Sequence, residues 1–187
     1  MQLTSENLVI VTRDGGAKDS KEVLVGRKKR GRFADHDIFP GGKAEGTVPQ
    51  DQEAARELQE ESGISVAPDT LRYLGKLLIY DKRPGQERFG NVFLYGASVE
   101  AGTEAIETDE LDPRWQPVDD PQLTNKMPPD VSLWWPAVRQ FDGTPIITHL
   151  TYDEDGALDV IVKKPDIAHT PGEIIQEATF PSPDRKG

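Results

Sequence analysis

Residues 39–64 read FPGGKAEGTVPQDQEAARELQEESGI, and the interpretation of the whole chain starts from this stretch. Six carboxylates fall within it, all after a Gly-Gly pair. From 49 to 62 the pattern is helical, with a proline and acidic residues at the start, where the first turn tolerates proline and the positive end of a helix favours negative charge. Gly63 suits the left-handed position that follows a helix. We therefore predict a helix over 49–62 that begins after a glycine turn.

Four carboxylates share one side of the predicted helix. At about 100° per residue, Glu57, Glu60 and Glu61 fall within about a third of the circumference, and Glu53 lies one turn earlier on the same side. Arg56 is the only basic residue in the helix, so we expect the acidic side to lack other counter-charge. Carboxylates without His or Cys suit Mg²⁺ or Mn²⁺, which bind carboxylates and phosphates together. The alternative is a solvated acidic surface, although a plain surface helix tends to alternate the sign of its charges.

Composition limits the class of protein. The chain has 187 residues, a formal net charge of −11 and no cysteine, so disulfides and thiolate metal sites are excluded. The charge argues against binding to nucleic-acid polymers, and a small anionic substrate requires bridging cations. The first residues lack the features of a signal peptide, and no apolar run approaches the roughly 20 residues that span a bilayer. We expect a cytoplasmic protein that binds no membrane.

The remaining pattern predicts an α+β domain over residues 1–164, with a mixed sheet flanked by two main helices. The second helix is expected from Asp130, which can cap it, to about Phe141, with Pro136 shortening or kinking it. From residue 165 to 187 the composition turns to proline, charged and small residues, which predicts a flexible or loosely docked tail. The predicted strands cover 7–13, 23–27, 71–80, 89–99 and 115–118, and a hairpin joins 144–152 to 157–163.

Residues 42–64 also carry a longer signature. The Nudix hydrolases share the pattern G-x5-E-x7-R-E-U-x-E-E-x-G-U, in which U is aliphatic. This chain resembles it with Gly42-x5-Val48-x7-Arg56-Glu57-Leu58-x-Glu60-Glu61-x-Gly63-Ile64. So many fixed positions make the signature far more specific than a lone glycine motif. The single departure is Val48, for which Glu45 or Glu53 partly substitutes in our interpretation. We expect weaker metal affinity or altered loop order at this point rather than loss of activity.

The resemblance extends over about residues 3–164 to the oxidised-purine nucleoside triphosphatases, a MutT-like subgroup of the family. The stretches 23–31, 107–115 and 128–136 carry it, and the subgroup's additional metal-binding glutamate corresponds to Glu110. The base-reading positions differ, because the subgroup's base-binding Asn aligns with Ile38 and its Trp-Pro-Asp-Asp aligns with Pro-Pro-Asp-Val here. Asp130 is then either a base contact or only a helix cap.

The resemblance implies an α/β/α sandwich and Mg²⁺-dependent attack of water on a nucleoside diphosphate linked to another group, with Mn²⁺ as a substitute cofactor. The implied substrate is a nucleotide, namely a nucleoside triphosphate, of which one with an oxidised purine is a candidate, cleaved to monophosphate and pyrophosphate. The implied catalytic residues are Glu57, Glu61 and Arg56. The implied metal ligands are Glu57, Glu60, Glu61, Glu110 and Gly42. The implied substrate contacts are Lys28, Ile38, Asp130 and Trp134.

Each of these roles has a structural alternative. Lys28 belongs to a basic run at 27–30, which is either a phosphate contact or a solvated strand end. Trp134 and Trp135 point about 100° apart on a helix, so one is expected in the core and the other beside the base. Two other functions stay open. The first is hydrolysis of a nucleotide sugar or a dinucleoside polyphosphate, and the second is nucleotide binding without catalysis.

Overall fold

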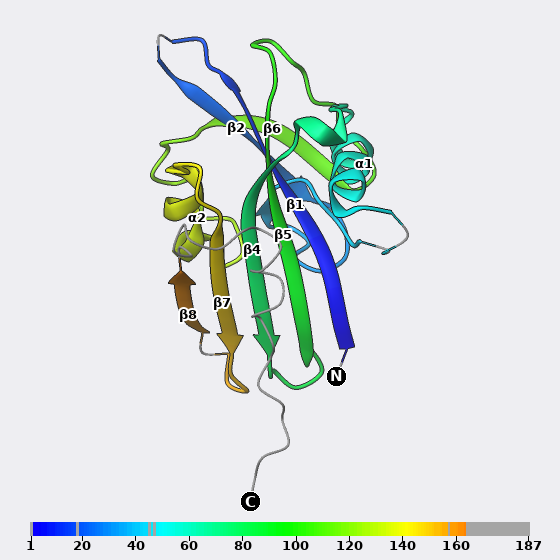
Figure 1. Ribbon diagram of the computed structural model, residues 1–187, viewed down its shortest axis with the longest axis vertical. Coiled ribbons are helices and arrows are strands. Elements are labelled where there is room, and N and C mark those ends of the chain that lie inside the picture. Colours follow the sequence, from blue (N-terminus) through cyan, green and yellow to red (C-terminus); the bar gives the residue numbers. More distant parts are fainter. Residues whose placement is uncertain (1, 18, 45, 47, 157, 164–187) are drawn as a thin grey trace, which may run out of the picture.

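The computed structural model describes residues 2–163 except residues 18, 45, 47 and 157, so the predicted tail and Glu45 lie outside the described residues. In this part of the chain an eight-stranded sheet carries two α-helices (Figure 1). The strands are β1 (Gln2–Asp14), β2 (Lys21–Lys28), β3 (Asp37–Ile38), β4 (Arg72–Asp81), β5 (Arg88–Ser98), β6 (Leu111–Pro117), β7 (Ile146–Tyr152) and β8 (Leu158–Lys163). The helices are α1 (Gln50–Ser62) and α2 (Val131–Arg139), with a 3₁₀ turn at Pro68–Thr70.

The sheet is mixed, as the pattern predicts. Its order is β3-β2-β1-β5-β4-β7-β8, and β6 pairs with β2 off this path. The pairs β1–β5 and β4–β7 are parallel, whereas β4–β5 and β7–β8 are antiparallel. The parallel pair β4–β7 sets the end of β4 beside the end of β7, and the antiparallel pair β4–β5 sets the start of β5 on the other side of the end of β4.

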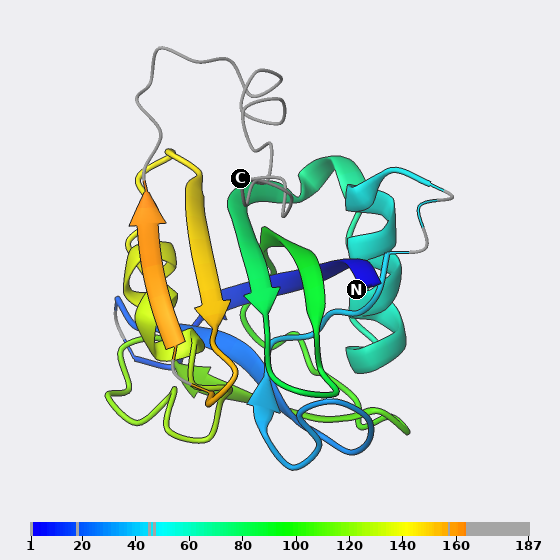
Figure 2. The ribbon, with the colours of Figure 1, turned by 90° about the horizontal axis from the view of Figure 1, so that it is seen from below.

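Two apolar layers lie on opposite faces of this sheet. Along β1 the side chains alternate, so that Val9 and Val11 pack with Leu58 of α1 while Ile10 packs with the cluster that includes Trp134 of α2. The two helices therefore cover different faces, and both views show strands of the sheet between them (Figures 1 and 2). The predicted α/β/α sandwich is confirmed.

Most predicted elements are present with shifted ends. The acidic helix begins at Gln50 and ends at Ser62; the following residue, Gly63, has a left-handed φ of 73° and its N–H donates to the Gln59 carbonyl. The second helix ends at Arg139 rather than Phe141, with Pro136 inside it. The prediction that Asp130 caps this helix is wrong, because its side chain makes no capping hydrogen bond. No helix in the described ranges is long and apolar enough to cross a bilayer.

Candidate active site

The glycine turn is attached to the sheet before α1 begins. The Asn7 N–H donates to the Gly42 carbonyl at 2.8 Å, and the Ala44 N–H donates to the Ser5 carbonyl at 2.9 Å. Gly41 has a φ of 155°, and a Cβ at that position would lie 2.0 Å from the Asn7 carbonyl oxygen. Only glycine permits so close an approach. The sheet therefore fixes the Gly41–Gly42 backbone at the position where α1 presents its carboxylates.

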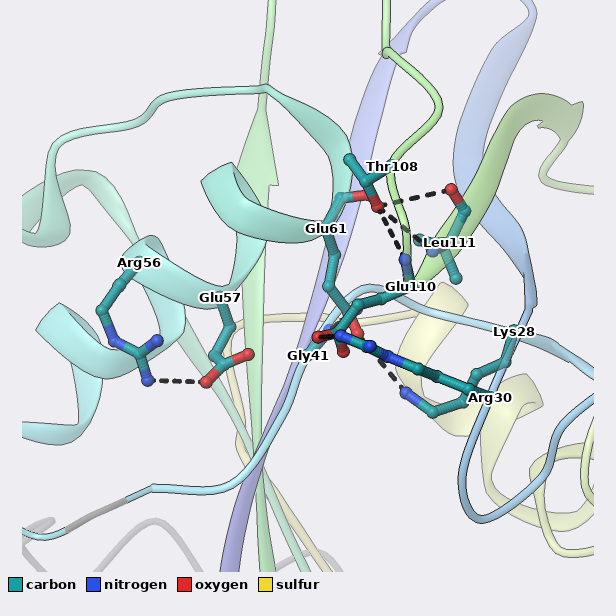
Figure 3. Close-up of polar contacts among 9 residues, drawn as sticks. All are labelled: Lys28, Arg30, Gly41, Arg56, Glu57, Glu61, Thr108, Glu110 and Leu111. Carbon is teal, nitrogen blue, oxygen red and sulfur yellow. Dashed lines mark hydrogen bonds and ion pairs between the residues drawn. The ribbon is translucent and has the colours of Figure 1, made fainter.

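Glu57 and Glu61 both converge on this glycine pair. The Gly41 N–H donates to Oε2 of Glu61 at 2.8 Å (Figure 3). The Glu57 carboxylate lies against Gly42 so closely that a Cβ on that glycine would be 2.2 Å from its Oε2. The side chains are four residues apart on one helix, so both carboxylates reach the same turn.

Burial makes both carboxylates poorly compensated anions. It raises the pKa of Glu57 above its ordinary value, although the Arg56 guanidinium acts to lower it. Burial likewise raises the pKa of Glu61, against the hydrogen bond from the Gly41 N–H and the charge of Lys28. A carboxylate whose pKa is raised by desolvation gains from any additional cation beside it. The pair is thus electrostatically suited to bind a divalent ion.

Arg56 joins three of the glutamates on the helix. Its guanidinium bonds to Glu53 at 2.9 Å, to Glu57 at 2.6 Å and to Glu60 at 2.6 Å, and these hydrogen bonds, those to Glu53 first, raise the pKa of Arg56. Glu53 is buried and held by this contact, which accounts for its charge without a metal. The Glu60 side chain is 57% exposed, so it lies at the rim rather than beside the glycine turn.

The expectation that the acidic side lacks other counter-charge is wrong. The ammonium of Lys28, from the end of β2, lies 3.4 Å from Oε1 of Glu61, and Arg30 pairs with Glu110 at 2.5 Å. Sequence spacing did not reveal these pairs because β2 and α1 approach only in the folded sheet. The basic run at 27–30 is therefore partly paired with the acidic site rather than simply solvated.

Thr108 is a residue of this site that sequence analysis missed. Its hydroxyl donates to the Glu61 carbonyl at 3.3 Å and accepts the N–H groups of Glu110 and Leu111 at 3.3 and 3.2 Å (Figure 3). It thereby ties the loop that carries Glu110 to the end of α1. The available signal was a threonine two residues before Glu110, since threonine hydroxyls commonly accept from N–H groups two and three residues on.

The predicted metal ligands are of the chemical type that Mg²⁺ prefers, but they are not arranged as a complete coordination sphere. Within residues 2–163 as described, no three His, Cys, Asp or Glu side chains stand together closely enough to hold a metal ion as they are. Glu57 and Glu61 instead contact Arg56 and Lys28. Their oxygens and the Gly42 carbonyl, which has a second lone pair, are the hard ligands that Mg²⁺ prefers. Glu110 lies near enough to raise the pKa of Glu57 further.

A cavity of about 480 Å³ adjoins the glycine turn on the α2 side of the sheet. The predicted substrate contacts Lys28, Ile38, Asp130 and Trp134 all line it, together with Gly41 and Gly42. Lys28 therefore connects the cavity to Glu61. Both tryptophans are buried in the same apolar cluster and pack on Phe39, and Trp134 also lines the cavity.

Asp130 is one of the buried polar residues in this wall. Its carboxylate accepts hydrogen bonds from Nε1 of Trp134 at 3.0 Å and from the Tyr152 hydroxyl at 2.9 Å. These contacts replace the helix-capping role, and they hold the carboxylate rigidly at the edge of the cavity. Pro128 and Val131 line the cavity on either side of it.

A model of the NUDIX domain matches residues 6–134, which is well over half of the chain. The chain belongs to the NUDIX family. Two proteins named "Oxidized purine nucleoside triphosphate hydrolase" are similar to it. The one from Danio rerio is 32% identical over 156 residues, covering 79% of this chain and 92% of the relative, and the one from Mus musculus is 34% identical over 120 residues, covering 64% and 73%.

Solved structures agree on the fold. The structure titled as the mutator MutT protein from Bacillus halodurans superposes with a TM-score of 0.67 at 20% identity, covering 87% of this chain and 99% of that one. Family and relatives together make this Nudix protein a hydrolase of the pyrophosphohydrolase type, and they confirm its resemblance to the MutT-like subgroup.

The Nudix signature departs from the family pattern at an exposed position. The Val48 side chain is 43% exposed and precedes the first residue of α1. Of its two suggested substitutes, Glu45 is outside the described residues, and Glu53 is committed to Arg56. Valine at position 48 therefore removes a carboxylate from the loop without leaving a gap in the core.

Proposed function

We propose that this Nudix hydrolase cleaves a nucleoside triphosphate, of which an oxidised purine triphosphate is one candidate, to the monophosphate and pyrophosphate with Mg²⁺. The observation that carries the proposal is the convergence of Glu57 and Glu61 on the Gly41–Gly42 turn, beside a cavity that Lys28 joins to Glu61. A triphosphate in contact with Lys28 reaches the carboxylates while its nucleoside enters the cavity. The net charge of −11 supports a need for divalent cations between protein and phosphates and argues against a nucleic-acid polymer as partner.

Each proposed site residue has a task that its surroundings support. Glu57 and Glu61, with Glu60 and Glu110 at the rim and the Gly42 carbonyl, would hold Mg²⁺. The bound cation would neutralise the phosphates and lower the pKa of water. One of Glu57 and Glu61 accepts the proton of the attacking water, since both carboxylates converge on the glycine turn and burial raises the pKa of each above its ordinary value. Arg56 positions the carboxylates through its charge-assisted hydrogen bonds.

The cavity is the proposed nucleoside site. Trp134 and Ile38 supply apolar wall, and Asp130 supplies a fixed acceptor. Such a combination of apolar surface with a few convergent polar groups is usual for small-molecule sites. Absence of cysteine supports a cytoplasmic location as part of the same proposal.

A second candidate is hydrolysis of a nucleotide sugar or a dinucleoside polyphosphate. It is favoured by the residues that line the cavity where the MutT-like subgroup carries its base-reading groups, namely Ile38, Pro128 and Val131. Apolar replacements discriminate bases weakly compared with hydrogen-bonding groups. The phosphate chemistry would be the same in both cases.

The test is a substrate panel with Mg²⁺, comprising canonical and oxidised dNTPs, a nucleotide sugar and dinucleoside polyphosphates, with products separated by chromatography. Glu57→Gln should lower turnover of the accepted substrate by about 10²–10⁴-fold, the usual range for a catalytic acid or base. Glu100→Gln, at an exposed glutamate remote from the glycine turn, is the matched control. Tight nucleotide binding without any product would contradict the proposal and identify a binding domain.

A further inference from the structure

One end of the cavity is polar although its floor is apolar. Tyr152 of β7 pairs with Asp81 of β4, and Asp81 pairs with Arg88 of β5, so these three residues form one row across the sheet. Directly paired residues project to the same face. The next residues on that face include Ile79, which lines the cavity floor, and Gly90, which has no side chain. The row is therefore a polar end wall beside an open apolar floor.

The end wall is reinforced from the loops. Asp81 is fully buried and accepts hydrogen bonds from Arg83 at 2.9 and 2.6 Å and from Arg32 at 3.2 Å. Arg83 also lies over the Tyr152 ring, 4.4 Å from its centroid. Arg32 and Arg88 both line the cavity. Asp81 thus fixes a group of cations at the end of the pocket, and Arg83 alone satisfies both of its oxygens.

Two of these arginines keep donors that the described protein does not use. Arg88 bonds to Glu6 through Nη1 at 2.7 Å, but its Nε is buried and has no partner among the described residues. Arg32 makes one long hydrogen bond to Asp81, and its side chain is 34% exposed. A buried donor without a partner costs free energy. If Arg88 had only a structural role at the end of the sheet, we would expect a protein acceptor for its Nε.

Local backbone strain accompanies Arg32. The next residue, Phe33, has a φ of 63°, a left-handed conformation that a bulky side chain rarely adopts, and the Arg32 guanidinium lies 4.8 Å from its ring centroid. Such strain is retained where surrounding structure demands it, and it concentrates at ligand sites. The loop therefore holds Arg32 over the cavity at an energetic cost.

The charges of the end wall distinguish between a phosphate and a neutral base as its ligand. Three arginines (Arg32, Arg83 and Arg88) face three carboxylates (Glu6, Asp81 and Asp130), and the carboxylates already accept bonds from protein donors. A wall without net charge does not favour a second phosphate. Free N–H groups beside a fixed acceptor favour instead the edge of a neutral planar group, as in the reading of a base by arginine.

We propose that Arg32 and Arg88 donate hydrogen bonds to acceptor atoms on the edge of the substrate's base, and that they select a 6-oxopurine over a 6-aminopurine. This inference rests on the proposed function, because it requires a nucleoside in the cavity. Both side chains carry donors only, so the amino group of an adenine-type base meets them donor against donor. Asp130 supplies the acceptor for the N1–H that a 6-oxopurine presents.

The test is binding of inosine and adenosine, which differ in the 6-oxo group and its adjacent N1–H, to the full chain without divalent cation. Affinities are measured by NMR titration, so hydrolysis is not required. The wild type should prefer inosine by about tenfold, the discrimination expected of a good arginine–base contact. Arg88→Lys keeps the charge and the pairing with Glu6 but removes Nε, and it should reduce the preference to less than about twofold. Arg32→Lys should weaken it in the same direction.

Arg13→Lys is the matched control, because Arg13 pairs with Glu22 at 2.8 Å with side-chain exposures of 15% and 27%, close to the 10% and 27% of Arg88 and Glu6. This variant should keep the wild-type preference. Equal binding of the two nucleosides, failure of the wild type to bind either, or an unchanged preference in Arg88→Lys overturns the inference. Displacement of inosine by inorganic phosphate in the wild type but not in Arg88→Lys overturns it in favour of an anion site.

An active hydrolase without base preference would overturn this inference alone, whereas an inactive protein with the preference would overturn only the proposed chemistry.

Discussion

At position 42 the absence of a side chain allows the Glu57 carboxylate to lie directly against the backbone. A methyl group there would lie 2.2 Å from Oε2 of Glu57, and it cannot be accommodated unless that carboxylate moves. Gly42 has no left-handed φ, so alanine fits the backbone itself. The requirement for glycine at this position therefore concerns the Glu57 carboxylate rather than the fold.

We expect Gly42→Ala to fold normally and to lose activity by more than about tenfold, because a displacement near 1 Å at a catalytic group commonly costs that much or more. Initial rates measure the loss of activity, and a thermal unfolding curve on the same preparation checks that the variant folds normally. Gly16→Ala, where an added Cβ meets nothing within 4 Å, is the control. An active Gly42→Ala enzyme would show that Glu57 has no fixed position in catalysis.

Asp81 gives the molecule a defined response to acid. Burial alone would raise its pKa, but the hydrogen bonds and charges of Arg83, with the charge of Arg32, outweigh burial and hold the pKa below its ordinary value of 3.8. A carboxyl group whose folded pKa is lowered stabilises the protein fully above its unfolded pKa, and this stabilisation is lost as the pH falls through the folded pKa.

Wild-type protein should therefore lose more free energy of unfolding than Asp81→Asn when the pH falls from about 5 to about 2.5. Urea unfolding at a series of pH values measures the two slopes. Asp153→Asn removes an exposed pair with Lys82 and should leave the wild-type slope nearly unchanged. Parallel curves for wild type and Asp81→Asn would show that the arginines do not stabilise the carboxylate.

At the scale of elements, the site depends on a joint between α1 and the loop before β6. Thr108 makes that joint with one hydroxyl, which bonds to the Glu61 carbonyl and to two N–H groups of the loop. Glu110 has no other side-chain contact with the helix among these bonds, and its carboxylate pairs with Arg30. The Ile106 N–H also donates to the Ser62 carbonyl at 2.9 Å, so Thr108 is a second tie between this loop and α1, two residues before Glu110.

Thr108→Val keeps the shape of the side chain and removes the joint. We expect a loss of about 1–3 kcal/mol in unfolding free energy, because two N–H groups lose their acceptor, and a higher Mg²⁺ concentration for half-maximal activity. Thr70→Val removes a comparable hydroxyl bond, to Ala67, far from the glutamates, and its Mg²⁺ dependence should equal that of the wild type. An unchanged Mg²⁺ dependence in Thr108→Val would separate Glu110 from metal binding.

The sequence predicts those elements whose signal is local. The helix at 50–62, its end at Gly63 and the strands around 7–13 and 72–81 follow from periodicity and turn residues. Long-range pairs such as Lys28–Glu61 and Asp81–Arg32 leave no trace in spacing, since β4–β7 and β1–β5 bring distant segments together only on folding. The capping role considered for Asp130 is wrong because its carboxylate accepts from Trp134 and from Tyr152, and Tyr152 lies 22 residues away, beyond any local pattern.

For the whole molecule, folding brings the buried carboxylates of Glu57 and Glu61 together at one site, and a divalent cation bound there should stabilise the folded state. A ligand that binds only the folded state at about 100 times its dissociation constant adds about 2.7 kcal/mol of stability. For a chain of this size that corresponds to a rise of roughly 5–10 °C in unfolding temperature.

Calorimetry with and without MgCl₂ measures this rise, with NaCl at equal ionic strength as the control for screening of the charge of −11. Glu57→Gln should reduce the specific rise to near zero, while EDTA should return the wild type to its metal-free value. Equal stabilisation by the two salts would place the cation in the diffuse ion atmosphere rather than at Glu57 and Glu61.

Lys28 belongs to both halves of the site at once, since its ammonium touches Glu61 while its side chain borders the cavity. The Lys28 ammonium can therefore interact either with Glu61 or with a ligand in the cavity. A ligand in the cavity that pairs with this ammonium removes the counter-charge of Glu61 and so favours binding of a divalent ion there. An ion bound to Glu61 in turn releases the ammonium to pair with the ligand. By thermodynamic reciprocity each must tighten the hold on the other by the same factor. We therefore expect the proposed divalent ion and nucleotide to bind cooperatively, because both act on the ammonium of Lys28 at the end of β2.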